Sequence, residues 1–417
     1  MKLKIHKLTE NIFSLLSLKG LQYIINFLLL PYILYILGAT KYGAIIFVQS
    51  IVQYFVIIVD YGFNLTGPKD IAKLTDPYKI RYKFTAIITT KISIMFVITT
   101  IFIILNYCFN ILSTYESKNL FLASYLLVVG NILFPIWFFQ GIQQMKYITI
   151  INFFAKCIVV SLIFILVKKP EDYILAALLL SGENIISGFF AIYIIIKKYK
   201  NILIVPNAKM IKRELINGWS LFVSTVAINI YTTTNIVLLG LITNTTIVGY
   251  FSAANKIIDG IKGAMFSVTQ AVYPYISELL KKSKEQTLIF IKQFCRIYVS
   301  SCFILSILLF CTAKIIVNLL FGSGYEATTK IFYILSFLPF VISISNVYGI
   351  QIMINFGKQK IFSKILFMAC ILDCLAIYPM VYYYDGIGVA IVMLFAELFI
   401  TICCLLYVKY KLKFGLF

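Results

Sequence analysis

Charged and amide side chains stand inside stretches of this chain that are otherwise apolar. Lys19, Gln22 and Asn26 are spaced at i, i+3 and i+7 and, with Tyr23, would share one face of a helix. An ammonium group binds phosphate as a point charge, and an amide can both donate and accept hydrogen bonds. A helix face of this composition is suited to bind a polar, anionic ligand.

Polar faces recur in three other apolar stretches. Their members are Gln49, Gln53 and Asp60 in 42–62; Thr225, Asn229 and Thr232 in 219–242; and Asn255 and Asp259, flanked by Lys256 and Lys262, in 249–272. An offset of 206 residues aligns Ser14-Leu15 with Ser220-Leu221, Gly43 with Gly249 and Gln49 with Asn255. We therefore expect two related halves, whose first two helices line a common pathway for the ligand.

Acidic side chains inside apolar stretches could couple transport to an ion. Glu183 and Glu397 each stand in the middle of an apolar stretch without an adjacent basic residue, and Asp259 is the third candidate. Other interpretations stay open. Polar groups can hold helices together, Lys256 and Lys262 could neutralise Asp259, and a lysine near a helix end can extend its ammonium group to the interface.

The composition indicates where such helices would lie. The chain is 61% hydrophobic, with a mean hydropathy of +0.95, whereas soluble domains are about 45–50% apolar. It is therefore predicted to be an integral membrane protein. The net charge of +21 would suggest nucleic acid in a soluble protein, but the basic residues fall in short loops. With one histidine, His6, and no Cys/His ligand spacing, no metal site is expected.

The apolar stretches predict an all-α integral membrane protein with twelve transmembrane helices in two pseudo-symmetric six-helix lobes. The predicted lobes are 1–196 and 219–417, joined by a cytoplasmic linker at 197–218. The predicted spans are 14–37, 42–62, 84–108, 120–139, 148–167, 174–196, 219–242, 249–272, 292–312, 331–354, 362–383 and 388–408.

The distribution of lysine and arginine predicts the orientation. Most of the 37 basic residues fall in the two termini and in every second loop. The alternate loops hold only Lys41, Lys118, Lys168, Lys169, Lys314 and Lys330. Because basic residues are retained in the cytoplasm, both termini are predicted to be cytoplasmic. The loops are short, which leaves no room for a soluble catalytic domain, so we do not expect an enzyme.

Two aromatic stretches each close an apolar run. They are Tyr61-Gly62-Phe63-Asn64-Leu65-Thr66-Gly67, followed by Asp70-Ile71-Ala72, and Pro135-Ile136-Trp137-Phe138-Phe139-Gln140-Gly141, followed by Met145-Lys146-Tyr147. One interpretation is an aromatic belt at the membrane surface followed by a turn. Taken together, they closely resemble signatures of the Wzx-type polysaccharide flippases of the multidrug/oligosaccharidyl-lipid/polysaccharide exporter superfamily. Unlike that family, this chain has little arginine in its spans, so lysines would have to bind the diphosphate.

The resemblance implies a flippase that moves an undecaprenyl-diphosphate-linked oligosaccharide from the cytoplasmic to the periplasmic leaflet by alternating access. It implies a multi-pass protein of the bacterial inner membrane, whose partners are membrane lipids, the lipid-linked substrate and polysaccharide assembly proteins. No cofactor and no nucleic acid are expected, and coupling to protons or Na⁺ is left open. The alternatives are a small-molecule exporter of the same superfamily or a membrane-embedded polymerase or glycosyltransferase.

Overall fold

The computed structural model describes residues 2–109, 115–199, 204 and 207–412; side chains are described throughout these ranges except at 2–24, 26, 115, 116, 220, 221, 223–225 and 227–232. The described residues form helices joined by short connections, without a β-strand among them. The elements are α1 (Lys2–Asp60), α2 (Phe63–Ile71), α3 (Pro77–Phe109), α4 (Tyr115–Leu133), α5 (Ile136–Gly141), α6 (Met145–Leu166), η1 (Pro170–Asp172), α7 (Tyr173–Lys198), α8 (Ala208–Ile242), α9 (Thr245–Lys282), α10 (Lys284–Phe321), α11 (Glu326–Leu335), α12 (Leu338–Ser345), η2 (Asn346–Ile354) and α13 (Gln359–Lys411).

Helices long and apolar enough to cross a membrane dominate the chain. Eight such segments are found among the described residues, so the prediction of an all-helical membrane protein is confirmed. Two of the helices contain a break. Gly38 has φ 70° and ψ 168° inside α1, a conformation open to glycine because it lacks a Cβ. Asp385 has φ 51° inside α13. Each break separates two predicted spans, and the number of twelve crossings stays a prediction.

The chain divides into two compact units. Unit 1 comprises 1–35 and 238–417, and unit 2 comprises 36–237. These boundaries differ from those of the predicted lobes, because the first predicted span belongs to unit 1 and most of the seventh to unit 2. The division into lobes at 1–196 and 219–417 therefore stays a prediction.

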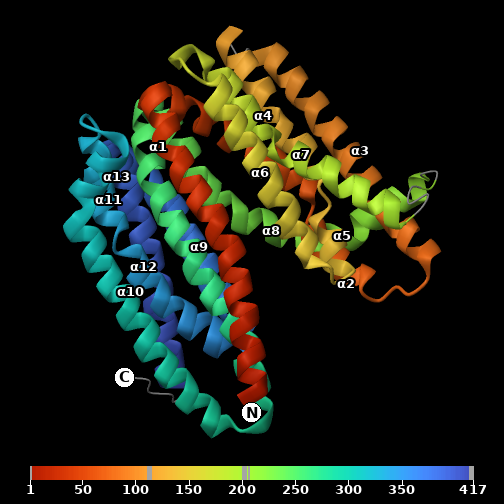
Figure 1. Cartoon of the computed structure of the whole chain (residues 1–417), viewed down its shortest axis with the longest axis vertical. Coiled ribbons are helices and arrows are strands. Elements are labelled where there is room, and N and C mark those ends of the chain that lie inside the picture. The colour runs from red at the N-terminus through yellow and green to blue at the C-terminus, as the bar shows by residue number, and fades with distance from the viewer. Residues whose placement is uncertain (1, 110–114, 200–203, 205–206, 413–417) are drawn as a thin grey trace. The chain divides into compact units, whose positions relative to one another are not determined.

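In unit 2, α7 packs against both α4 and α6. Helices α4 and α7 lie side by side (Figure 1), and glycine permits their close approach. A Cβ on Gly130 would lie 2.6 Å from the Cβ of Asn184, and one on Gly188 would lie 2.5 Å from the Cβ of Leu133. Small residues at such contacts bring two backbones together, which increases van der Waals packing where the hydrophobic effect between helices is absent.

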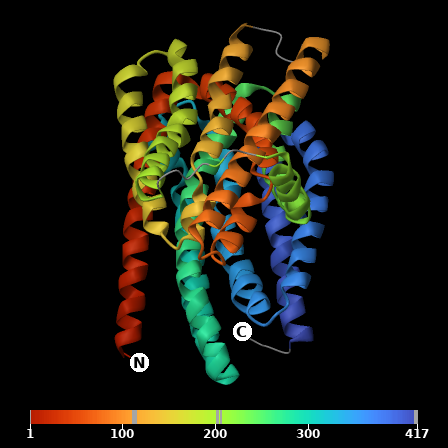
Figure 2. The same ribbon diagram turned by 90° about the vertical axis from the view of Figure 1, so that its right-hand side faces the viewer.

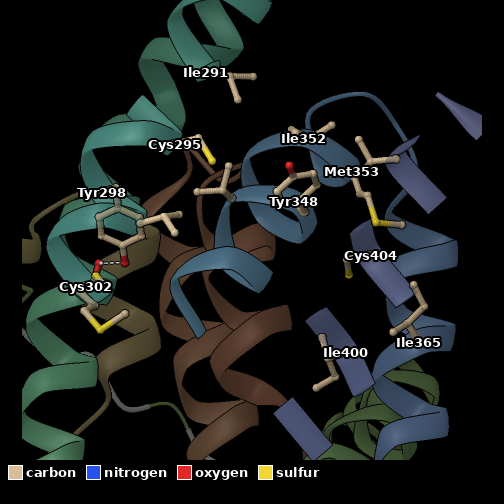
Figure 3. Close-up of a cluster of buried hydrophobic side chains, with 14 of the residues drawn as sticks. Ile291, Cys295, Tyr298, Cys302, Tyr348, Ile352, Met353, Ile365, Ile400 and Cys404 are labelled. Atoms are coloured by element: carbon tan, nitrogen blue, oxygen red, sulfur yellow. Dashed lines mark hydrogen bonds between the residues drawn. The ribbon is translucent and has the colours of Figure 1, made fainter. Parts of the chain in front are cut away.

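The core of unit 1 is a cluster of buried side chains from α9, α10, η2 and α13 (Figure 3). Cys295 and Tyr298 come from α10, Tyr348 and Ile352 from η2, and Cys404 from α13. The first residues of α1, the α9–α10 connection and the last residues of α13 lie at the same end of this unit (Figures 1 and 2). This arrangement agrees with termini on one side of the membrane, whereas which side is cytoplasmic stays a prediction.

Candidate functional site

The two aromatic stretches pack against each other in unit 2. Tyr61 (φ 48°) and Gly62 (φ 76°) end α1 and redirect the chain into α2, while Pro135 precedes α5. A Cβ on Gly67 would lie 2.8 Å from the Trp137 ring. A Cβ on Gly141 would lie 2.6 Å from the Cβ of Ile71. The close contact of α2 with α5 therefore depends on these two glycines. Below, residues 61–72 and 135–141 together are called the aromatic junction.

The aromatic side chains of this junction form a core. Phe63, Trp137, Phe138 and Phe139 are each at most 1% exposed. An aromatic belt would place these rings at the membrane surface, so that interpretation is wrong for these four residues. They belong to the buried core at which α2 packs against α5. The sequence indicated the importance of both stretches but not their mutual contact, which joins residues 70 positions apart in the chain, Gly67 with Trp137 and Ile71 with Gly141.

The aromatic junction also holds the start of α8. The Tyr61 hydroxyl donates a 3.1 Å hydrogen bond to the Leu215 carbonyl, and its ring stacks on Phe222 at a centroid distance of 4.4 Å. Gly218 lies against the same ring, since a Cβ there would be 2.9 Å from it. The end of the predicted linker 197–218 is therefore a helix packed on unit 2.

An ionic cluster reinforces this attachment. The Lys83 ammonium group lies 2.7 Å from a carboxylate oxygen of Glu214 in α8 and 2.7 Å from a carboxylate oxygen of Asp70 in α2. Glu214 is only 4% exposed. Because its charge is buried and shared with Lys83, Glu214 ties α8 to α3, and Lys83 in turn ties α3 to α2.

A second ion pair lies at the end of α1. The ammonium group of Lys91 in α3 lies 2.9 Å from Asp60 and also donates to the side-chain oxygen of Asn131 at 3.2 Å. The Asn64 amide donates to the same Asp60 oxygen at 2.8 Å. Asp60 was expected to share a polar face with Gln49 and Gln53, which stays a prediction; its carboxylate pairs with the buried Lys91 and the half-buried Asn64. Asn64 thus has a structural contact inside the junction.

The remaining predicted residues of unit 2 whose side chains the structure describes are partly buried in the helix bundle. The Gln49 amide donates to the Ser181 hydroxyl of α7 at 3.0 Å, and Gln53 is half-buried. Glu183 lies 3.4 Å from Lys156 of α6. Glu183 has no basic neighbour on its own helix, so only the packing of α6 on α7 provides its partner. Gln140 is half-buried at the end of the junction.

Unit 1 brings together the predicted charges of α9. Asn255 donates to Asp259 at 2.9 Å, and Lys262 lies 3.4 Å from the other oxygen of that carboxylate. Glu397 of α13 lies beyond ion-pair distance of Lys262 but within range of its charge. Lys256 is exposed. Below, Asn255, Lys256, Asp259, Lys262 and Glu397 are called the α9 charge cluster.

An open cavity adjoins the α9 charge cluster. It has a volume of about 650 Å³ and is lined by Lys256, Asp259 and apolar residues of α1, α9 and α10 that include Leu28, Leu309 and Ile316. A charged edge on an apolar cavity can bind an amphipathic molecule, with its anionic part near the lysine and its hydrocarbon along the walls.

Five predicted substrate-binding residues lie outside the described side chains: Lys19, Gln22, Asn26, Thr225 and Asn229. Their binding role stays a prediction. The side chains that the structure describes contain no group of three or more His, Cys, Asp or Glu residues that could bind a metal ion. The absence of a metal in the protein's function likewise stays a prediction.

The chain has relatives among known protein families and curated proteins. The model of a family described as "Polysaccharide biosynthesis protein" matches residues 8–280. A protein of Escherichia coli (strain K12) named "Putative O-antigen transporter" is 34% identical over 406 residues, which cover 96% of this chain and 97% of that protein. A protein of the same name from Shigella dysenteriae is 30% identical, covering 96% of this chain and 100% of the relative.

The fold is similar to that of solved structures. An inward-facing MATE-family multidrug resistance transporter of the MOP superfamily superimposes with a TM-score of 0.74 at 14% identity, covering 93% of this chain and 94% of that one. The lipid II flippase MurJ in an inward closed conformation superimposes with a TM-score of 0.71 at 18% identity, covering 95% and 87%. At these identities the likeness establishes a common fold.

Proposed function

Because the chain belongs to the polysaccharide biosynthesis protein family, we propose that it is a flippase for an undecaprenyl-diphosphate-linked oligosaccharide repeat unit. It would move this substrate from the cytoplasmic to the periplasmic or outer leaflet during the synthesis of surface polysaccharide. The O-antigen transporter names of its relatives and its likeness in fold to a lipid II flippase support transport of a lipid-linked sugar. The protein acts in the bacterial inner membrane, and its termini are proposed to be cytoplasmic.

The observation that best supports this proposal is the position of the α9 charge cluster beside an apolar cavity in unit 1. Lys256 and Asp259 line the cavity, and its other walls are mostly apolar. A lipid-linked diphosphate has the matching chemistry, because its diphosphate is anionic and its polyprenyl chain is hydrocarbon. Lysine binds such a group as a point charge.

We propose that the diphosphate competes with Asp259 and Glu397 for Lys262. Lys262 pairs with Asp259 at 3.4 Å and lies within range of the charge of Glu397. An incoming diphosphate would draw Lys262 and the exposed Lys256 toward itself and leave the two carboxylates without their cation. A proton or Na⁺ would then neutralise a carboxylate. In this mechanism coupling is an exchange of partners around one lysine, and alternating access is a rocking of one lobe on the other.

The second candidate is a small-molecule exporter of the same superfamily, which the fold shared with a MATE-family transporter favours. The names of the sequence relatives favour the lipid-linked sugar instead. A polymerase or glycosyltransferase has weaker support, because the relatives are named transporters.

Deletion of the gene in its own bacterium tests the substrate class. A flippase for lipid-linked repeat units predicts loss of surface polysaccharide and accumulation of undecaprenyl-linked oligosaccharide in the membrane, both reversed by the gene on a plasmid. A polymerase predicts that single repeat units still reach the cell surface. A small-molecule exporter predicts intact polysaccharide with increased sensitivity to toxic compounds, and either of these outcomes would overturn the proposal.

A further inference from the structure

The first three turns of α8 have two chemically different faces. One face is packed on unit 2. Met210, Glu214 and Gly218 are buried on it, and Glu214 pairs with Lys83 at 2.7 Å. This face repeats at intervals of four residues, as expected for one side of a helix. Because one side of these turns is packed on unit 2, the opposite side faces away from unit 2 and is exposed.

The outward face combines cations with large apolar side chains. Lys209, Lys212 and Arg213 are exposed, Ile216 is 65% exposed and Trp219 is 59% exposed. Lys209, Lys212, Arg213 and Ile216, with Asn217, surround a surface pocket of about 260 Å³. Below, Lys209, Lys212, Arg213, Ile216 and Trp219 are called the basic face.

The cations of the basic face have no acidic partner among the described residues. The ion pairs of the described side chains do not include Lys209, Lys212 or Arg213. The acidic residue nearest to them in the chain, Glu214, is on the opposite side of the helix and is occupied by Lys83. Three positive charges thus face outward within five residues.

We propose that the basic face binds the head groups of anionic phospholipids in the adjacent leaflet. The positive charge of the basic face is complementary to these head groups, because clustered basic side chains next to a membrane attract acidic lipids. Trp219 and Ile216 supply the second component. Tryptophan favours the boundary between head groups and hydrocarbon, and an amphipathic helix lies in the interface with its apolar side chains inserted.

The extent of the basic face favours a lipid surface over a single bound molecule. The helix rises by about 15 Å from Lys209 to Trp219, and this length is greater than the diameter of one phosphate group. Its opposite side is held by the aromatic junction through Tyr61 and Gly218. Lipids would therefore bind to a part of α8 that is fixed on the aromatic junction and that continues into the rest of this helix.

Fluorescence quenching can test this proposal, because the protein contains only two tryptophans. Trp219 is exposed and Trp137 is 1% exposed, so lipid-borne quenchers reach Trp219 selectively. The full chain is reconstituted into phosphatidylcholine vesicles that contain an equal mole fraction of either brominated phosphatidylglycerol or brominated phosphatidylcholine. Trp219→Phe gives the background from Trp137. We expect stronger quenching by brominated phosphatidylglycerol, and this preference should weaken with added salt.

The variants separate charge recognition from general contact with lipid. Lys209→Gln/Lys212→Gln/Arg213→Gln should lose the preference, whereas Lys209→Arg/Lys212→Arg should keep it. The matched control is Lys281→Gln/Lys282→Gln/Lys284→Gln, which removes three exposed cations elsewhere and should keep the preference. Elution as a single peak in size-exclusion chromatography shows that each variant is folded. Equal quenching by both lipids in the unmodified protein, or a preference that survives the triple substitution at 209, 212 and 213, would overturn the proposal.

Discussion

Lys91 donates a 2.9 Å hydrogen bond to Asp60, and the two residues are 1% and 9% exposed. Asp60 ends α1 immediately before the two residues of positive φ that redirect the chain. Asn64 donates to the same carboxylate oxygen. The ion pair thus fixes the turn from which the aromatic junction begins.

Removing one partner of this ion pair should destabilise the protein. Lys91→Met leaves the Asp60 carboxylate buried without its cation, which costs about 3–5 kcal/mol. The double variant Asp60→Asn/Lys91→Met removes both charges and should recover most of the loss. Thermal unfolding in detergent measures the effect. A Lys91→Met protein as stable as the unmodified one would contradict the assignment of a structural role to this pair.

Gly67→Ala should destabilise the aromatic junction. The new Cβ would lie 2.8 Å from the Trp137 ring, and overpacking of this kind costs about 1–3 kcal/mol. The matched control is Gly182→Ala in α7, where a Cβ would meet no atom within 4 Å. Comparison of the two melting temperatures checks the prediction, which is refuted if both variants unfold at the same temperature.

Glu397 and Glu183 should differ in their effect on coupling. Glu397 interacts with Lys262 of the α9 charge cluster, whereas Glu183 pairs with Lys156 between two helices of unit 2. We expect Glu397→Gln to remove the pH dependence of transport and Glu183→Gln to keep it. Transport in proteoliposomes as a function of external pH provides the test. An unchanged pH profile in Glu397→Gln would show that Glu397 does not couple transport to an ion and serves in helix packing instead.

Asp172 should stabilise the α6–α7 connection at neutral pH. The backbone N–H groups of Lys168 and Lys169 each donate to its carboxylate at 2.9 Å, and these bonds lower the pKa of Asp172 below its ordinary value. Because the folded-state pKa is lowered, the stabilisation is present above the ordinary pKa of about 3.9. It is lost as the pH falls through the lower folded-state value.

The corresponding experiment compares Asp172→Ala with the unmodified protein at several pH values. The variant should melt at a lower temperature at pH 7, and the difference should disappear in strong acid. A difference that stays constant down to the lowest pH would mean that the carboxylate charge is not responsible.

Local sequence patterns predicted the fold class well. The long apolar stretches predicted the helices, because a membrane requires each span to satisfy its own backbone hydrogen bonds. The units were harder to predict. In the sequence Gly38 resembles an ordinary loop glycine. No local sequence pattern indicates that residues 1–35 belong to the same unit as 238–417.

The candidate site was predicted in part. Spacing along α9 placed Asn255 and Asp259 on one face and Lys262 close enough to neutralise Asp259, and both Asn255 and Lys262 contact Asp259. Partners from other helices could not be predicted, because packing of distant segments brings Lys156 to Glu183 and Lys83 to Glu214. The aromatic junction was recognised by its motifs, although its burial contradicts the aromatic belt that its residue types suggest.

The most direct test of the proposed function is the flipping of a lipid-linked diphosphate by the reconstituted protein. Undecaprenyl-diphosphate-linked oligosaccharide would be placed in proteoliposomes, and its appearance in the opposite leaflet measured with a membrane-impermeant lectin. We predict rapid flipping by the unmodified protein and by Lys281→Met, and a loss of at least tenfold in Lys262→Met, since a charge-assisted contact contributes about 1.5–3 kcal/mol. Flipping by Lys262→Met at the unmodified rate, or no flipping by the unmodified protein, would contradict the account.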